Sequence, residues 1–209
     1  MRLRNTLPLI FALCLAPNFA HAQSGLDVFF GVGTASASSS NQSLDLLGTG
    51  TSYNTPSLAG VFGKAGADYM ITPHFGVGGE ADFRFAQGAY TELNYRPTFY
   101  DFNGIWAPTL RNFKRVVPEF EAGIGVAHVG FYANNSYCDP LVGCSTTSTY
   151  VEGSNHFQVH LSAGLRLYAT SHLFFRPQVD AHYVNNFFQF GQNWVPEYGG
   201  AIGWSFGEH

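Results

Sequence analysis

The sequence predicts an all-β fold, namely a transmembrane antiparallel up-and-down β-barrel of about eight strands. Two observations point to it. Only 11% of the 209 residues are charged, whereas a soluble domain usually carries roughly 25%. Apolar residues alternate with polar or small ones along most of the chain, which is the period of a strand with two different faces. Because every backbone amide inside a bilayer must be paired, strands can cross it only as a closed barrel.

The N-terminal segment indicates export. Arg2 and Arg4 precede the apolar run LPLIFALCLA, and Ala20-His21-Ala22 has the small residues of a cleavage site. We therefore expect a signal peptide in residues 1–22 and a barrel domain in residues 23–209. Removing Arg2 and Arg4 lowers the basic count from 10 to 8 against 14 acidic residues, a formal charge of −6. This balance argues against nucleic acid as a partner.

The alternation recurs in eight segments, each of which we expect to be a strand. In chain order they are residues 26–33, 59–71, 76–86, 94–107, 118–130, 156–169, 174–184 and 199–206. The apolar face holds Leu26, Val28 and Phe30 in the first segment; Val61, Ala65 and Tyr69 in the second; Val77, Ala81 and Phe83 in the third; Phe120, Ile124 and Val126 in the fifth; Leu161, Leu165 and Leu167 in the sixth; Phe175, Val179 and Tyr183 in the seventh; and Ile202, Trp204 and Phe206 in the last. Residues 94–107 are aromatic enough for a strand, but their pattern does not fix which side chains share a face.

The composition of the two faces indicates which one meets lipid. The apolar face is uniformly aliphatic and aromatic, as contact with hydrocarbon requires. The other face carries Gly, Ser and isolated ions, which suits a narrow lumen filled by side chains. The ions on this face are Lys64, Asp68, Glu80, Asp82, Arg84, Glu119, Glu121, Arg166, Arg176 and Asp180. We expect them to pair with one another inside the barrel; a soluble barrel with an apolar core is the alternative.

The connections also fit a barrel in an outer membrane. Residues 71–75 and 169–173 have the composition of tight turns, whereas residues 34–57 and 132–155 are long and rich in Ser, Thr, Asn and Gly. Cys138 and Cys144 lie in the second long stretch. Because an exported protein meets oxidising conditions, we expect these two cysteines to form a disulfide.

With these features the chain resembles the small bacterial outer-membrane β-barrels, typified by the transmembrane domain of OmpA and by OmpX. The most specific element is the last segment, GGAIGWSF, which is similar to the C-terminal signal read by the barrel-assembly machinery, although Gly207-Glu208-His209 follow it here. The resemblance implies a location in the outer membrane, contact with its lipid and lipopolysaccharide, and loops that face the environment. It implies no cofactor and no metal, and it does not identify an extracellular partner.

One group of residues allows a chemical interpretation. A hairpin centred on residue 171 places His160 opposite His182 and Ser162 opposite Asp180, so that a Ser/His/Asp group gathers on the polar face. The fragment HLSAGL is similar to a segment of PagL-type lipid A deacylases, which would make His160 the base and Ser162 the nucleophile. Ala163 stands where those enzymes have asparagine, and turning this face to lipid would expose Arg166 to hydrocarbon.

The sequence therefore favours a barrel of structural or surface-interaction type, in which His160, Ser162, Asp180 and His182 pack the lumen and catalyse nothing. Two other functions stay open at this stage. One is a PagL-like lipid A deacylase that uses His160 and Ser162, and the other is a narrow porin-like channel.

Overall fold

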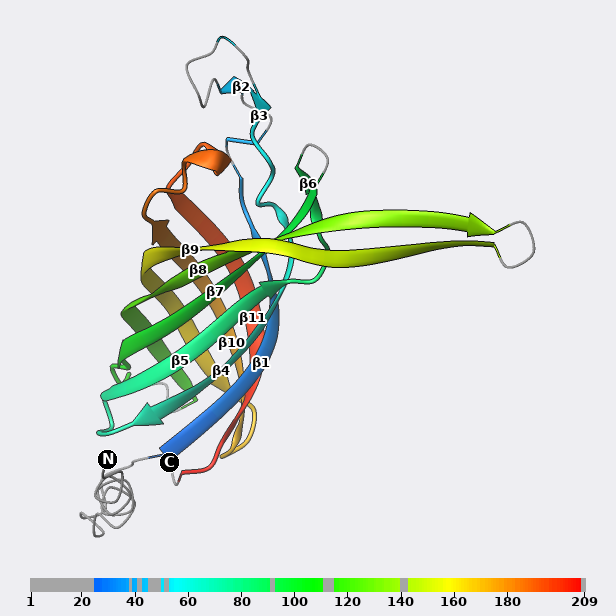
Figure 1. Ribbon diagram of the computed structural model, residues 1–209. Coiled ribbons are helices and arrows are strands. Elements are labelled where there is room, and N and C mark those ends of the chain that lie inside the picture. Colours follow the sequence, from blue (N-terminus) through cyan, green and yellow to red (C-terminus); the bar gives the residue numbers. More distant parts are fainter. Residues whose placement is uncertain are drawn as a thin grey trace, which may run out of the picture.

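The computed structural model describes residues 25–37, 39–40, 43–44, 50, 53–90, 93–110, 115–139 and 143–207; the expected signal peptide, residues 1–22, lies outside them. In this part of the chain eight long strands close into a ring (Figure 1). In chain order they are β1 (Gly25–Ala35), β4 (Gly60–Met70), β5 (Phe75–Arg84), β7 (Leu93–Trp106), β8 (Val116–Asp139), β9 (Gly143–Tyr168), β10 (Leu173–Val184) and β11 (Trp194–Ser205). All eight expected strands are present.

Each long strand pairs antiparallel with its neighbours in the chain, and the last strand returns to the first. β1 pairs with β4 on one side and with β11 on the other, where Phe30 lies opposite Ile202. This closure leaves no free sheet edge among the eight described long strands and confirms the up-and-down barrel. The smaller elements are β2 (Ser43–Leu44), β3 (Tyr53–Asn54), β6 (Gly88–Tyr90) and the 3-10 turn η1 (Phe188–Phe190). No helix in the described residues has both the length and the apolar character needed to cross a membrane.

The two ends of the barrel differ in the length of their connections. At one end, which we call the turn end, residues 71–74 and 169–172 make two turns of the same construction. The Thr72 hydroxyl accepts hydrogen bonds from the backbone N–H groups of His74 and Phe75, at 3.3 and 3.0 Å. The Thr170 hydroxyl does the same for His172 and Leu173, at 3.2 and 2.9 Å. A threonine near the start thus shapes both turns locally.

The predicted faces are confirmed strand by strand. Phe30 on β1 points outward with 69% of its surface exposed, whereas Lys64 on β4 is 2% exposed inside the barrel. The structure also settles β7, whose faces the pattern left open. Tyr100 and Phe102 point outward, while Asp101 and Asn103 are buried inside.

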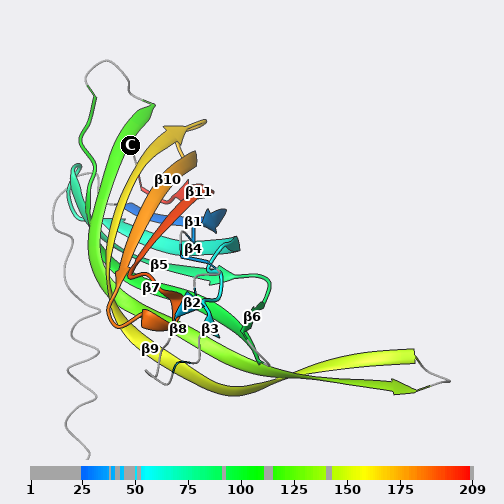
Figure 2. The same cartoon turned by 90° about the horizontal axis from the view of Figure 1, so that it is seen from above.

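The opposite end, which we call the loop end, differs from the expectation. Within residues 34–57 the short strands β2 and β3 pair with each other, and the larger difference lies in the second long stretch. Residues 132–155 were expected to be a loop, but β8 and β9 continue through them as a paired hairpin up to Asp139 and Gly143. This hairpin projects sideways, well beyond the barrel (Figures 1 and 2). A register shift between Phe131 and Tyr132 marks where it leaves the wall. Because water lies on both of its faces, it has no apolar side, and alternation could not reveal it.

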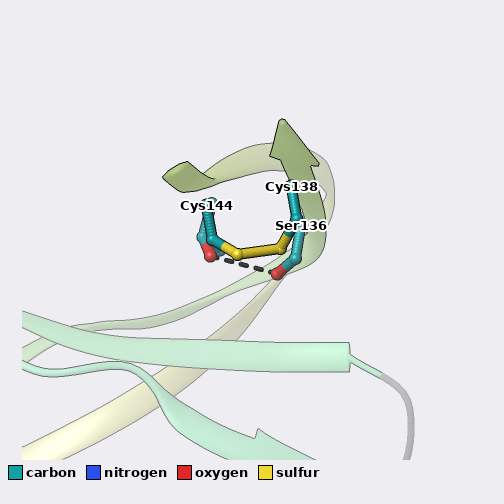
Figure 3. Close-up of a disulfide and its surroundings, with 4 residues drawn as sticks. Ser136, Cys138 and Cys144 are labelled. Carbon is teal, nitrogen blue, oxygen red and sulfur yellow. Dashed lines mark hydrogen bonds between the residues drawn. A yellow bond between two sulfur atoms is a disulfide. The ribbon is translucent and has the colours of Figure 1, made fainter. Parts of the chain in front are cut away.

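The hairpin is fastened near its tip and at its base. A disulfide joins Cys138 and Cys144, which face each other across the two strands, as the sequence predicted (Figure 3). The Ser136 and Thr146 hydroxyls share a hydrogen bond of 3.0 Å beside it. Nearer the barrel, the Gln87 side-chain amide donates to the Ser148 hydroxyl at 3.1 Å, which links the hairpin to the connection before β6.

Candidate functional site

The residues singled out in the sequence meet inside the barrel. His160 on β9 lies opposite His182 on β10, and Ser162 lies opposite Asp180. Both pairs follow the register that the short turn predicted. The two imidazole rings stack with their centroids 4.7 Å apart and their planes 20° apart. All four side chains are buried in the lumen, with Ser162 the most exposed at 9%.

The two ring nitrogens of His160 contact groups other than the Ser162 hydroxyl. Its Nδ1 lies 2.9 Å from the Asn103 side-chain oxygen, and its Nε2 lies 3.4 Å from Asp180 Oδ1. A histidine that activates a serine nucleophile holds its hydroxyl within about 3 Å. Both nitrogens of His160 instead contact groups of the lumen, so the arrangement fits a packed polar interior better than a nucleophile with its base.

Four carboxylates in the half of the lumen toward the loop end surround a single lysine. Lys64 Nζ lies 2.9 Å from Glu80, 2.7 Å from Asp82, 3.0 Å from Asp180 and 3.1 Å from Glu197. The five side chains come from four strands, β4, β5, β10 and β11, and are all buried. They form the first of two ionic layers across the lumen, which we call the lysine layer.

Two arginines build the second layer, nearer the turn end, which we call the arginine layer. Arg176 lies 2.9 Å from Asp68, 3.0 Å from Glu80, 3.3 Å from Glu119 and 2.9 Å from Glu121. Arg166 contacts Asp27, Asp68 and Glu119. Guanidinium groups suit this position because their planar donors can serve several carboxylates at once. The pairing expected for the lumenal ions is confirmed for nine of the ten, with partners far apart in the sequence. The expectation was wrong for Arg84, which lies near the loop end and donates instead to the Ser57 carbonyl and the Tyr95 hydroxyl, at 3.1 and 3.2 Å.

Apolar clusters lie above and below the ionic layers. At the loop end Leu58, Phe62, Phe99, Phe187 and Phe190 are each no more than 1% exposed and pack with neighbouring apolar residues into one cluster. Phe187 and Phe190 belong to the connection between β10 and β11, which folds inward over the lumen. At the turn end a smaller cluster joins Met70 with Ile105. A third cluster joins Phe29 with Phe174 beside the arginine layer, with the Arg176 guanidinium 4.1 Å from the centroid of the Phe29 ring. The lumen is thus apolar at both ends and ionic between them.

Comparison with known structures agrees with this geometry. The chain is similar to a major outer membrane protein from Thermus thermophilus, with 12% identity and a TM-score of 0.55 over 89% of this chain and 100% of that one. It is also similar to Neisserial surface protein A, with 14% identity and a TM-score of 0.52 over 88% of this chain and 98% of that one. The fold is that of a small outer-membrane β-barrel.

More distant in shape is Ail, the attachment invasion locus protein of Yersinia pestis, with 12% identity and a TM-score of 0.48 over 88% of this chain and 97% of that one. No family model matches the chain, and no curated protein matches its sequence. The similarity to the Thermus and Neisserial proteins confirms the expected resemblance for the fold, and the particular role has to be argued from this chain's own residues.

Several lumenal residues were missed by the sequence pattern. Asp101, Asn103, Gln158 and Glu197 all line the interior and are at most 7% exposed. The first two lie in the strand whose faces could not be assigned. Gln158 lies on the inward face of residues 156–169, two positions before His160, and Glu197 lies one inward position before residues 199–206. Extending the period of two by one or two steps toward the loop end would have found Gln158 and Glu197.

Proposed function

We propose that this protein is an outer-membrane β-barrel of structural or surface-interaction type, exported by a cleaved signal peptide, with a filled lumen and no catalytic site. The observation that supports this most is that the interior is filled with packed side chains, whereas the loop end exposes a long hairpin to water. The interior is packed with paired ions between two apolar closures. The loop end carries a long hairpin that is exposed to water on both faces.

The side chains on the outward face support a position of the barrel within a lipid bilayer. Aliphatic side chains such as Val32, Ile124 and Leu161 are 46–58% exposed on the wall. Exposed aromatic residues lie toward both rims, as in the girdles at the two interfaces of membrane barrels. Those near the turn end are Tyr69, Phe75, Trp106, Phe120, Trp204 and Phe206, and those near the loop end are Phe83, Phe85, Phe157, Trp194 and Tyr198.

A position in the outer membrane implies which molecules the barrel contacts and which of its ends faces the periplasm. Outer-membrane lipid and lipopolysaccharide surround the wall, and the barrel-assembly machinery inserts it by recognising β11. Short turns face the periplasm in such barrels, and long loops face outward. The turn end is therefore periplasmic and the hairpin lies outside the cell.

The residues inside the barrel argue against the two other functions, a channel and a lipid A deacylase. A channel needs a continuous polar path, but Phe62, Phe99 and Phe187 cover the lumen at the loop end. A lipid A deacylase needs its nucleophile at the lipid face, but Ser162 shares the buried side of β9 with His160 and Arg166. Turning Ser162 outward would turn Arg166 outward with it, at a cost of about 2–4 kcal/mol near the membrane midplane.

The hairpin is the part best built to meet a partner. It is rich in hydroxyl and amide side chains, Tyr137 near its tip is 70% exposed, and the disulfide holds its end together. A rigid extended arm loses little conformational entropy on binding, which favours contact with another molecule.

Surface labelling tests the orientation. Intact cells that carry Thr147→Cys in the hairpin should react with a membrane-impermeant maleimide, while cells with the matched control Ser171→Cys at the turn end should not. Both positions are exposed to water in the folded protein, so only their side of the membrane separates them. Labelling of Ser171→Cys alone would reverse the orientation and remove the hairpin from the cell surface.

Two assays test the absence of transport and catalysis. The purified protein should give no steady ion conductance in planar bilayers. Lipid A from cells with and without the protein should have the same mass spectrum. A persistent conductance would favour the channel, and loss of an acyl chain that Ser162→Ala abolishes would favour the deacylase.

A further inference from the structure

The lumen holds more negative charge than its side chains neutralise. Among the described residues, nine carboxylates are buried inside the barrel, and three cationic side chains are buried with them. The carboxylates are Asp27, Asp68, Glu80, Asp82, Asp101, Glu119, Glu121, Asp180 and Glu197, and the cations are Lys64, Arg166 and Arg176. Nine negative and three positive charges leave a formal excess of six negative charges. Because isolated buried charges are costly, such an excess calls for bound protons or a bound cation.

The number of carboxylates per cation is highest in the lysine layer, where four carboxylates surround one lysine; in the arginine layer five carboxylates surround two arginines. An ammonium group has three N–H donors, yet Lys64 lies within 3.1 Å of four carboxylates. The second oxygens of these carboxylates differ in what they contact. Those of Glu80 and Asp180 accept hydrogen bonds from Gln178 or Arg176. Asp82 Oδ2 and Glu197 Oε2 are buried and have no hydrogen-bond partner among the described residues.

A buried histidine lies beside these two oxygens. Neither ring nitrogen of His182 has a hydrogen-bond partner in the described part of the chain, and the side chain is 0% exposed. The potential ligand atoms of Asp82, His182 and Glu197 all lie within 4.8 Å of one another. The imidazole stacks against Phe99, at 4.6 Å and 17°, and against His160, at 4.7 Å and 20°. The ring is therefore held in its plane, close to two carboxylate oxygens that have no hydrogen-bond partner among the described residues.

We propose that Asp82, His182 and Glu197 bind a divalent transition-metal ion of the zinc class within the barrel. Two carboxylates and one imidazole form an N/O donor set that suits such an ion. Ligand atoms about 2.1 Å from a tetrahedral ion lie roughly 3.4 Å apart, so each donor has to move inward by about 1 Å or less. Two positive charges would also offset part of the excess around Lys64.

Asp101 is not one of the three proposed metal ligands, but it lies where it can orient the His182 ring. Its Oδ2 has no hydrogen-bond partner among the described residues and lies 3.6 Å from His182 Nδ1. Its other oxygen accepts a hydrogen bond of 2.7 Å from Gln158. Histidines that bind a metal through one nitrogen commonly donate the other N–H to a carboxylate, which orients the ring. His182 would thus bind the ion through Nε2 and donate from Nδ1 to Asp101.

Two other groups of acids and histidines are less suitable. His160 lies near His182 and Asp101, but the two stacked imidazole planes do not converge, and their in-plane lone pairs cannot meet at one ion. Asp68, Glu119 and Glu121 also lie together, but this group contains no imidazole, and two guanidinium groups, those of Arg166 and Arg176, pair with it, whereas the single ammonium group of Lys64 pairs with Asp82 and Glu197.

Metal analysis of refolded protein tests the proposal. Because apolar clusters cover the lumen, the ion has to be supplied while the barrel folds. Protein without a polyhistidine tag is refolded from urea into detergent micelles with zinc, passed over a chelating resin and measured by elemental mass spectrometry. His182→Phe removes the donor but keeps a stacking ring. His160→Phe is the matched control, since it removes a neighbouring buried imidazole outside the donor set. Glu197→Gln is a second, isosteric variant that removes one carboxylate.

We expect about one zinc ion per chain for the wild type and for His160→Phe, with zinc–ligand distances of about 2.0–2.1 Å by X-ray absorption. We expect a value near zero for His182→Phe and for Glu197→Gln, each scored only where heat-modifiable gel mobility shows a folded barrel. Absence of zinc from the wild type would overturn the proposal, because the excess charge would then be met by protons. Retention of zinc by a folded His182→Phe or Glu197→Gln, or its loss from folded His160→Phe, would overturn the assignment of donors.

Discussion

Placing an arginine on the outward face of β9 tests whether that face lies in a bilayer. Leu161 is 46% exposed on the wall and lies between Ala122 and Ala181 of the neighbouring strands. A strand rises about 3.3 Å per residue, and with a tilt near 40° each residue changes the depth by roughly 2.5 Å. The steps from Leu161 to Leu167 thus span about 15 Å, which exceeds half of an apolar band about 25 Å tall.

This geometry sets the expected costs. Leu161→Arg should lower the free energy of unfolding by about 2–4 kcal/mol, whereas Leu167→Arg near the turn end should lower it by about 0–1 kcal/mol. Leu161→Met is the matched control, since it keeps an apolar side chain of similar size and should cost less than about 1.5 kcal/mol. Urea titration in lipid vesicles measures these values. Trp106, Trp194 and Trp204 are 45–53% exposed on the wall and report insertion by their fluorescence. Equal costs at both leucines would refute the assigned membrane depth.

Three further predictions follow from the interior and the hairpin. Arg176→Met leaves Asp68, Glu80, Glu119 and Glu121 without this partner and should cost about 3–5 kcal/mol in the same titration; a cost under about 1 kcal/mol would show that the arginine layer is not needed. Phe62→Ala removes a fully buried ring from the closure at the loop end and should cost about 3–5 kcal/mol, whereas an unchanged titration would mean that this cluster is not packed. Replacing both Cys138 and Cys144 by Ser should leave the free energy of unfolding of the barrel within about 0.5 kcal/mol of the wild-type value. The hairpin tip should become cleavable by protease, which mass spectrometry would detect. Cleavage at the same rate as in the wild type would contradict a stabilising role of the disulfide.

The sequence predicts the wall of the barrel well because the period of two is a local property. Leu165 and Arg166 must point to opposite sides of any strand, and the structure places them so. The pairing of His160 with His182 was also accessible, because a short turn at residues 169–172 fixes the register of the hairpin.

The faces of β7 could not be predicted because the lumen is not polar throughout. Tyr95 and Phe99 point inward and join the apolar closure at the loop end, while Tyr100 and Phe102 point outward. Aromatic residues therefore occupy both faces, and alternation of polarity disappears. The partners of the lumenal ions were inaccessible for another reason. Arg176 meets Asp68 across the ring, 108 residues earlier in the chain, and only closure of the barrel brings such positions together.

The central claim is that this chain folds as a barrel whose apolar wall requires lipid or detergent around it. Refolding from urea with and without detergent micelles tests it most directly, with heat-modifiable gel mobility as the readout. We expect the compact, heat-modifiable form to appear only when micelles are present, because the exposed wall includes Phe30, Ile124, Leu161 and Ile202. Cooperative folding in plain buffer to a monodisperse monomer would contradict the account, since it would show that this face does not need an apolar surrounding.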